Sequence, residues 1–127
     1  MAGGAVIVAG FGFRGEATVE SLADAFAQTG STGGVTGLAT AADKAGTTAF
    51  SDFAQSLRLP VHAIEASAIA QQTTSTQSDV AFATRATGSL AEAAALAAAG
   101  PGARLIAPRV VSRDRMATCA LAEGQTG

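Results

Sequence analysis

The feature that most restricts the fold of this chain is a glycine pattern that follows a short apolar run near the N-terminus. Five apolar residues, Ala5 to Ala9, lead into Gly10-Phe11-Gly12-Phe13-Arg14-Gly15. A helix is expected next, because Thr18 can cap it and because Val19, Leu22 and Phe26 recur at helical spacing. An unbroken apolar run of this kind is typical of a strand that is covered on both faces in a parallel sheet. A strand, a glycine-rich turn and a helix in this order predict an α/β fold.

Further strands and helices are predicted to alternate along the chain. Strands are expected at residues 35–39, 60–64 and 104–110, and a turn at residues 112–115 precedes a returning strand at 116–122. Ser89 and Glu92 match a capping box at the start of an Ala-rich helix, and the polar residues 71–77 predict an exposed loop. We therefore expect one domain over residues 1–127, with a three-layer α/β/α arrangement, a mixed, mainly parallel sheet and a C-terminal β-hairpin.

Charge and composition exclude several classes of protein. Eight basic and ten acidic residues give a net charge of −2, whereas a nucleic-acid-binding protein would need a basic excess, so no nucleic-acid partner is expected. No apolar run approaches the roughly 20 residues that span a membrane, and no signal peptide is recognised, so a cytoplasmic protein without a membrane partner is expected. With one cysteine, Cys119, and one histidine, His62, neither a metal site nor a cofactor is expected.

The spacing of Gly10, Gly12 and Gly15 matches the Gly-x-Gly-x-x-Gly pattern of dinucleotide-binding turns. Glycines let the backbone approach an anion, and the N-terminus of the following helix presents free N–H groups to it. The acidic residue that binds the ribose is expected after the second strand, where Leu38-Ala39-Thr40 stands instead. Two alternatives remain open from the pattern: a small nucleotide-binding module that uses the Gly10–Gly15 loop, and a tight turn that binds nothing.

Several segments, taken in their order and spacing, resemble one known family. The segments are Val8–Arg14, Thr18–Glu20, Leu38–Thr40 with Lys44, Gly88–Leu96, Leu105–Arg109 and Ala117–Ala120. They are similar to the CobE / CbiG C-terminal-domain family of cobalamin biosynthesis proteins, over about residues 4–124. Phe13 stands where many relatives have cysteine, Gly15 where many have a second basic residue, and Arg109 where lysine is common, so no thiol role is carried over to position 13.

The resemblance implies a role in building the corrin ring. Two-domain relatives open a lactone and release a two-carbon fragment from a cobalt-precorrin, and this chain resembles only their C-terminal domain. Stand-alone relatives belong to the oxygen-dependent pathway. The resemblance therefore implies binding or processing of an anionic precorrin or corrinoid intermediate, with other cobalamin-pathway enzymes as further partners, and it leaves the catalytic residues unassigned.

The predicted ligand contacts follow two strands. Corrin precursors carry carboxylates, which the cations Arg14 and Lys44 and the backbone N–H groups of Gly10–Gly15 would bind. Because these segments follow strands that are expected to be neighbours, they should meet at one end of the sheet. Arg113 and Arg115 are expected to form the polar end of a hairpin. The predicted ligand-binding residues are Gly10, Phe11, Gly12, Phe13, Arg14, Thr40, Lys44 and Arg109.

Overall fold

The computed structural model of the chain describes residues 5–30, 34–65, 67–68, 87–100 and 103–125. Its strands are β1 (Ala5–Phe13), β2 (Gly37–Ala41), β3 (Val61–Ile64), β4 (Arg104–Val111) and β5 (Ala117–Gln125). Its helices are α1 (Val19–Gln28), α2 (Ala42–Ala45), α3 (Thr48–Leu57) and α6 (Thr87–Ala99). The polar loop predicted at residues 71–77 lies outside the described residues.

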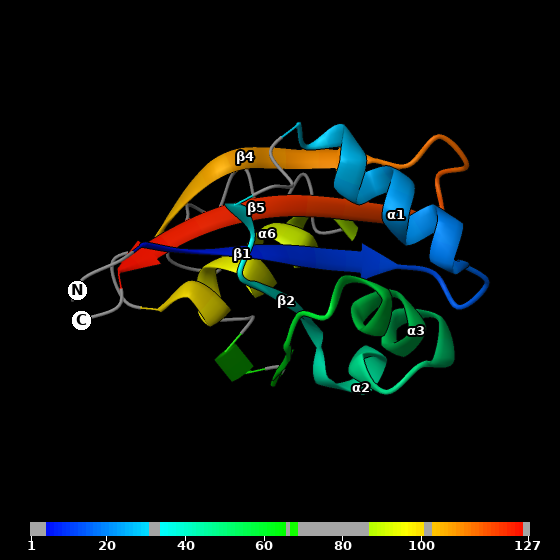
Figure 1. Ribbon diagram of the computed structural model, residues 1–127, viewed down its shortest axis with the longest axis horizontal. Coiled ribbons are helices and arrows are strands. Elements are labelled where there is room, and N and C mark those ends of the chain that lie inside the picture. Colours follow the sequence, from blue (N-terminus) through cyan, green and yellow to red (C-terminus); the bar gives the residue numbers. More distant parts are fainter. Residues whose placement is uncertain (1–4, 31–33, 66, 69–86, 101–102, 126–127) are drawn as a thin grey trace.

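Within the described residues, five strands form one mixed sheet in the order β3-β2-β1-β5-β4 (Figure 1). Parallel pairing joins β1 to β2 and β2 to β3, whereas β5 is antiparallel to both β1 and β4. Strands β1 to β4 therefore all run in one direction and end on the same side, where β5 begins. We call this side the carboxyl end of the sheet. The predicted α/β class with a mixed sheet is confirmed.

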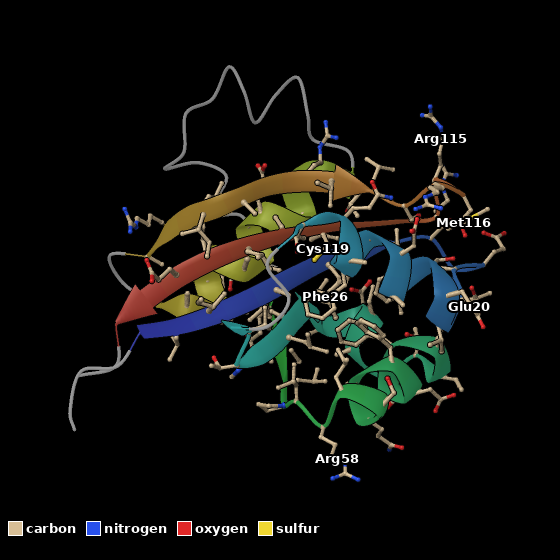
Figure 2. All side chains as sticks on the ribbon, turned by 45° about the horizontal axis from the view of Figure 1, so that its top comes forward. Glu20, Phe26, Arg58, Arg115, Met116 and Cys119 are labelled. Carbon is tan, nitrogen blue, oxygen red and sulfur yellow. The ribbon has the colours of Figure 1, made fainter. Side chains whose placement is uncertain are left out.

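One face of the sheet packs against α1 and α3 through a cluster of phenylalanines. Phe11 on β1 is fully buried, and its ring contacts those of Phe26, Phe50 and Phe53 at centroid distances of 5.4 to 6.1 Å. Figure 2 shows Phe26 and Cys119 in the interior, between α1 and the strands. Because side chains alternate along a strand, Phe13 faces the same side as Phe11.

The opposite face of the sheet is covered by α6 (Figure 1). A Cβ atom added at Gly10 on β1 would overlap the carbonyl oxygen of Ala91 and would lie 2.5 Å from the backbone nitrogen of Ala95. A Cβ atom at Gly124 on β5 would overlap the carbonyl oxygen of Ala99 in the same way. Glycine therefore fits at these two strand positions because it leaves room for the helix backbone.

Strand β1 extends beyond the apolar run that predicted it. A glycine turn was expected from Gly10 onward, but β1 continues to Phe13, and it pairs with β5 as far as the Phe13–Ala117 pair. The prediction of a turn at residues 10–13 is wrong. The strand continues because Phe11 and Phe13 enter the phenylalanine cluster and Gly10 admits α6 on the other face.

Helix α6 begins earlier than the sequence pattern indicated. Its first residue is Thr87, so Ser89 lies inside the helix and not at its cap. The carboxylate of Glu92 accepts a hydrogen bond from the backbone N–H of Arg109 at 3.2 Å. The predicted capping box is therefore wrong, and Glu92 instead joins α6 to β4.

Candidate functional site

The three cations among the predicted ligand residues lie toward the carboxyl end of the sheet. Arg14 directly follows β1 and is exposed, and Lys44 is half-buried in α2, which directly follows β2. Arg109 is exposed on β4, two residues before its end, and β5 separates this edge strand from β1, so Arg109 does not lie beside Arg14 and Lys44. Because β1 and β2 are parallel neighbours, the segments that carry Arg14 and Lys44 emerge side by side, as expected.

Lys44 lies over the end of β1. Its ammonium nitrogen is 5.7 Å from the centroid of the Phe13 ring, which is a cation–π distance. The other side of that interaction is fixed, because Phe13 stacks on Phe50 with centroids 5.6 Å apart and an angle of 11° between the rings. Since Arg14 is the next residue after Phe13, this contact holds Lys44 beside the segment that carries Arg14.

The other five predicted ligand residues are buried. They are Gly10, Phe11, Gly12, Phe13 and Thr40. The hydroxyl of Thr40 donates to the carbonyl oxygen of Phe11 at 2.9 Å, so it joins β2 to β1. The N–H of Arg14 donates to the carbonyl oxygen of Met116 at 2.9 Å. Residues 10–13 are therefore part of the sheet, and Arg14 is hydrogen-bonded to the turn between β4 and β5. The open glycine loop that the nucleotide-binding alternative requires is not present at these residues.

The connection between β1 and α1 is attached to the turn between β4 and β5 by a chain of hydrogen bonds. The N–H of Met116, whose carbonyl oxygen binds Arg14, donates to Oδ1 of Asp114 at 3.0 Å. Oδ2 of Asp114 accepts a bond from the hydroxyl of Ser21 at 2.6 Å. Ser21 also forms the capping box with Thr18 that starts α1. The carboxylate thus links a turn, a helix start and the residue after β1.

The two arginines that flank Asp114 have different surroundings. The backbone N–H of Arg113 donates to Oδ2 of Asp24 at 2.7 Å, and its guanidinium lies 3.7 Å from Oδ1 of the same carboxylate. Arg115 has a positive φ of 63° and is exposed, and Figure 2 shows its side chain extending outward from the turn. Arg113 is therefore part of the contact between the turn and α1.

Hydrogen bonds lower the pKa of Asp114 below its ordinary value of 3.8. The donors are the hydroxyls of Ser112 and Ser21 and the N–H of Met116. Because the pKa is lower in the folded state, the stabilisation is complete above the unfolded-state pKa and is lost as the pH falls through the folded-state pKa. We expect Asp114→Asn to lower the free energy of unfolding at neutral pH, and the difference from wild type to shrink below about pH 4.

Urea unfolding of both proteins at neutral and acidic pH measures this difference. A difference of equal size at the two pH values would show that the charge of Asp114 does not contribute to stability.

The one cysteine and the one histidine of the chain give no further site. Cys119 is fully buried, and this burial raises the pKa of its thiol, which disfavours the reactive thiolate. His62 is exposed on β3 and lies beside Gly37, with Nε2 3.1 Å from where a Cβ of that glycine would be. In the part of the chain that the structure describes, no three His, Cys, Asp or Glu side chains gather to hold a metal. No helix in the same part is long and apolar enough to cross a membrane.

Asp114 and Ser21 were missed as a pair by the sequence analysis. The bond between Asp114 and Met116 could have been predicted from the sequence, because an aspartate in a turn commonly accepts a hydrogen bond from the N–H two residues ahead. The bond from Ser21 joins residues 93 positions apart, and no local pattern indicates it.

Comparisons with known proteins agree with the resemblance seen in the sequence. The family described as Cobalamin synthesis G C-terminus matches residues 7–122. The crystal structure of CobE, a protein from the cobalamin (vitamin B12) biosynthetic pathway, is 27% identical over 100% of this chain and 96% of that chain, with a TM-score of 0.79. The cobalamin biosynthesis protein chiG from Agrobacterium tumefaciens str. C58 is 35% identical over 92% of this chain and 97% of that chain, with a TM-score of 0.72.

A comparison with curated protein sequences found no match. The family match nevertheless covers most of the chain, and both solved structures share its fold over nearly their whole length. The chain belongs to the CbiG C-terminal / CobE family of cobalamin biosynthesis proteins.

Proposed function

We propose that the carboxyl end of the sheet binds an anionic precorrin or corrinoid intermediate. The observation that carries the proposal is the placement of Arg14 and Lys44 after neighbouring parallel strands, with Lys44 fixed over the ring next to Arg14. Membership of the family supplies the class of ligand, a macrocycle with carboxylates on its rim. Charge-assisted hydrogen bonds from guanidinium and ammonium groups to carboxylates are among the strong ones in proteins.

The same end of the sheet also carries acidic residues. Glu16 lies between β1 and α1, Asp43 precedes Lys44, and Glu65 follows β3, and all three are exposed. The field at this end is therefore mixed in sign, and it does not attract anions uniformly. Binding would therefore depend on contacts between the ligand and individual cations. These are Arg14 and Lys44, with Arg109 on β4 as a third.

Binding or transfer of the intermediate fits this chain better than covalent chemistry. The resemblance to the family places Phe13 where many relatives have cysteine, and the Phe13 ring is buried against Phe50. The thiol of Cys119 is buried with a raised pKa, which disfavours the reactive thiolate. Other enzymes of the pathway, in the cytoplasm, would then deliver the intermediate to this protein or receive it.

Titration with hydrogenobyrinic acid, a carboxylate-bearing corrinoid, tests the proposal. We expect saturable binding, followed by visible absorption, that weakens as salt is added. Arg14→Ala and Lys44→Ala should each lower the affinity by about tenfold or more, the loss typical of a hydrogen bond to a charged group.

Arg58→Ala is the matched control, because Arg58 follows α3 and precedes β3, at the other end of the sheet. Figure 2 shows its side chain extending away from the protein. Binding no tighter than about millimolar, or an equal loss of affinity in Arg58→Ala, would contradict a site made by Arg14 and Lys44.

A further inference from the structure

The connection that carries Arg14 has little packing of its own. Arg14, Gly15 and Glu16 are all exposed, and a Cβ atom added at Gly15 would have no neighbour within 4 Å. Of residues 14–18 only Ala17 is buried, at 7% exposure. A segment with so few apolar contacts opens easily unless hydrogen bonds hold it.

Asp114 is linked to both ends of this connection. At the first end, Oδ1 accepts the N–H of Met116, and the carbonyl oxygen of Met116 accepts the N–H of Arg14. At the second end, Oδ2 accepts the hydroxyl of Ser21, whose oxygen accepts the N–H of Thr18 at 3.1 Å. The carboxylate of Asp114 is therefore linked to Arg14 through Met116 alone and to Thr18 through Ser21 alone.

We propose that Asp114 is a positioning residue, which fixes the β1–α1 connection so that Arg14 is held ready for the anionic ligand. The inference rests on the proposed function for the identity of that ligand. The physical basis is that a cation whose backbone is ordered before binding loses less conformational entropy when its ligand arrives. Asp114 acts on the ligand through Arg14 and does not touch it.

Asp24 provides a matched control for this role. It lies on α1, as Ser21 does, and it is bonded to the β4–β5 turn through the N–H and the guanidinium of Arg113. Its carboxylate is not part of the chain of bonds that leads through Met116 to Arg14. Asp24→Ala therefore loosens the same turn from the same helix without breaking the link to Arg14.

Hydrogen exchange measured without ligand tests the fixing of the connection. In Asp114→Ala the amides of Arg14, Ala17 and Thr18 should exchange about tenfold faster than in wild type, as for the loss of a hydrogen bond to a charged group. In Asp24→Ala their exchange should stay near the wild-type rate. Unchanged exchange at these amides in Asp114→Ala would overturn the proposal.

A double-mutant cycle with hydrogenobyrinic acid tests whether Asp114 acts through Arg14. Asp114→Ala should weaken binding by about tenfold in wild type and should have no further effect in Arg14→Ala. An equal loss in both backgrounds would show a general structural role and would overturn the proposal. If Asp114→Ala does not fold, Asp114→Asn replaces it in both experiments, because it keeps the size of the side chain and removes the charge that strengthens the bonds to Met116 and Ser21.

The two experiments separate the failure of this inference from the failure of the proposed function. If the wild-type protein does not bind the corrinoid, the proposed function fails, and hydrogen exchange alone then decides whether Asp114 fixes Arg14. If the wild type binds and the cycle shows no coupling, the proposed function stands and the positioning role fails.

Discussion

Gly10→Ala is expected to lower the free energy of unfolding by about 3 kcal/mol, at the upper end of the usual cost of overpacking. The added methyl group would overlap the carbonyl oxygen of Ala91 and crowd the backbone nitrogen of Ala95. Both atoms belong to the backbone of α6, so no side-chain rotation relieves the overlap, and the helix must move off the sheet. The expected loss of stability is large because a shift of α6 weakens its contacts with the strands along its length.

Gly15→Ala is the control, since it changes a glycine of the same motif. No atom lies within 4 Å of the added Cβ at Gly15. This variant should be neutral or should stabilise the fold by up to about 1 kcal/mol, because alanine restricts the unfolded chain. Urea unfolding followed by circular dichroism measures both variants, since the chain has no Trp or Tyr for fluorescence. Equal stabilities of the two variants would contradict the close contact between Gly10 and α6.

Phe11→Ala is expected to lower the free energy of unfolding by about 3 to 5 kcal/mol. Phe11 is fully buried, and its ring has edge or tilted contacts with Phe26, Phe50 and Phe53. Removing the ring leaves a cavity that the three neighbouring rings, held by α1 and α3, can fill only in part. Phe11 is also among the predicted ligand contacts, and removing a side chain that only contacted a ligand would leave the free energy of unfolding nearly unchanged.

Phe11→Leu separates the loss of volume from the loss of the aromatic ring. Leucine keeps most of the apolar volume, and its cost should be below about 1.5 kcal/mol. The same unfolding measurement applies to both variants. If Phe11→Ala were as stable as Phe11→Leu, the phenylalanine cluster would not be the centre of the core.

Sequence patterns determined those parts of the protein that depend on near neighbours along the chain. The start of α1 at Thr18 was predicted correctly, because a capping threonine and the spacing of Val19, Leu22 and Phe26 act within a few residues. The turn after β4 was predicted for the same reason, from residues 112–115 alone. The placement of Arg14 and Lys44 after neighbouring strands followed from the order of strands and helices, since parallel neighbours end at the same side of a sheet.

Only the tertiary structure decided what the glycine motif does. The letters Gly-x-Gly-x-x-Gly fit a turn and a strand equally well, because glycine allows both conformations. Residues 10–13 form a strand because the Phe11 ring packs against three other aromatic rings. They also do so because the backbone of α6, a helix far away in the sequence, lies directly on Gly10. The link from Asp114 to Ser21 was decided in the same way, since it joins residues that are neighbours only after β5 pairs with β1. Contacts of this kind depend on the packing of whole elements, and no local pattern contains them.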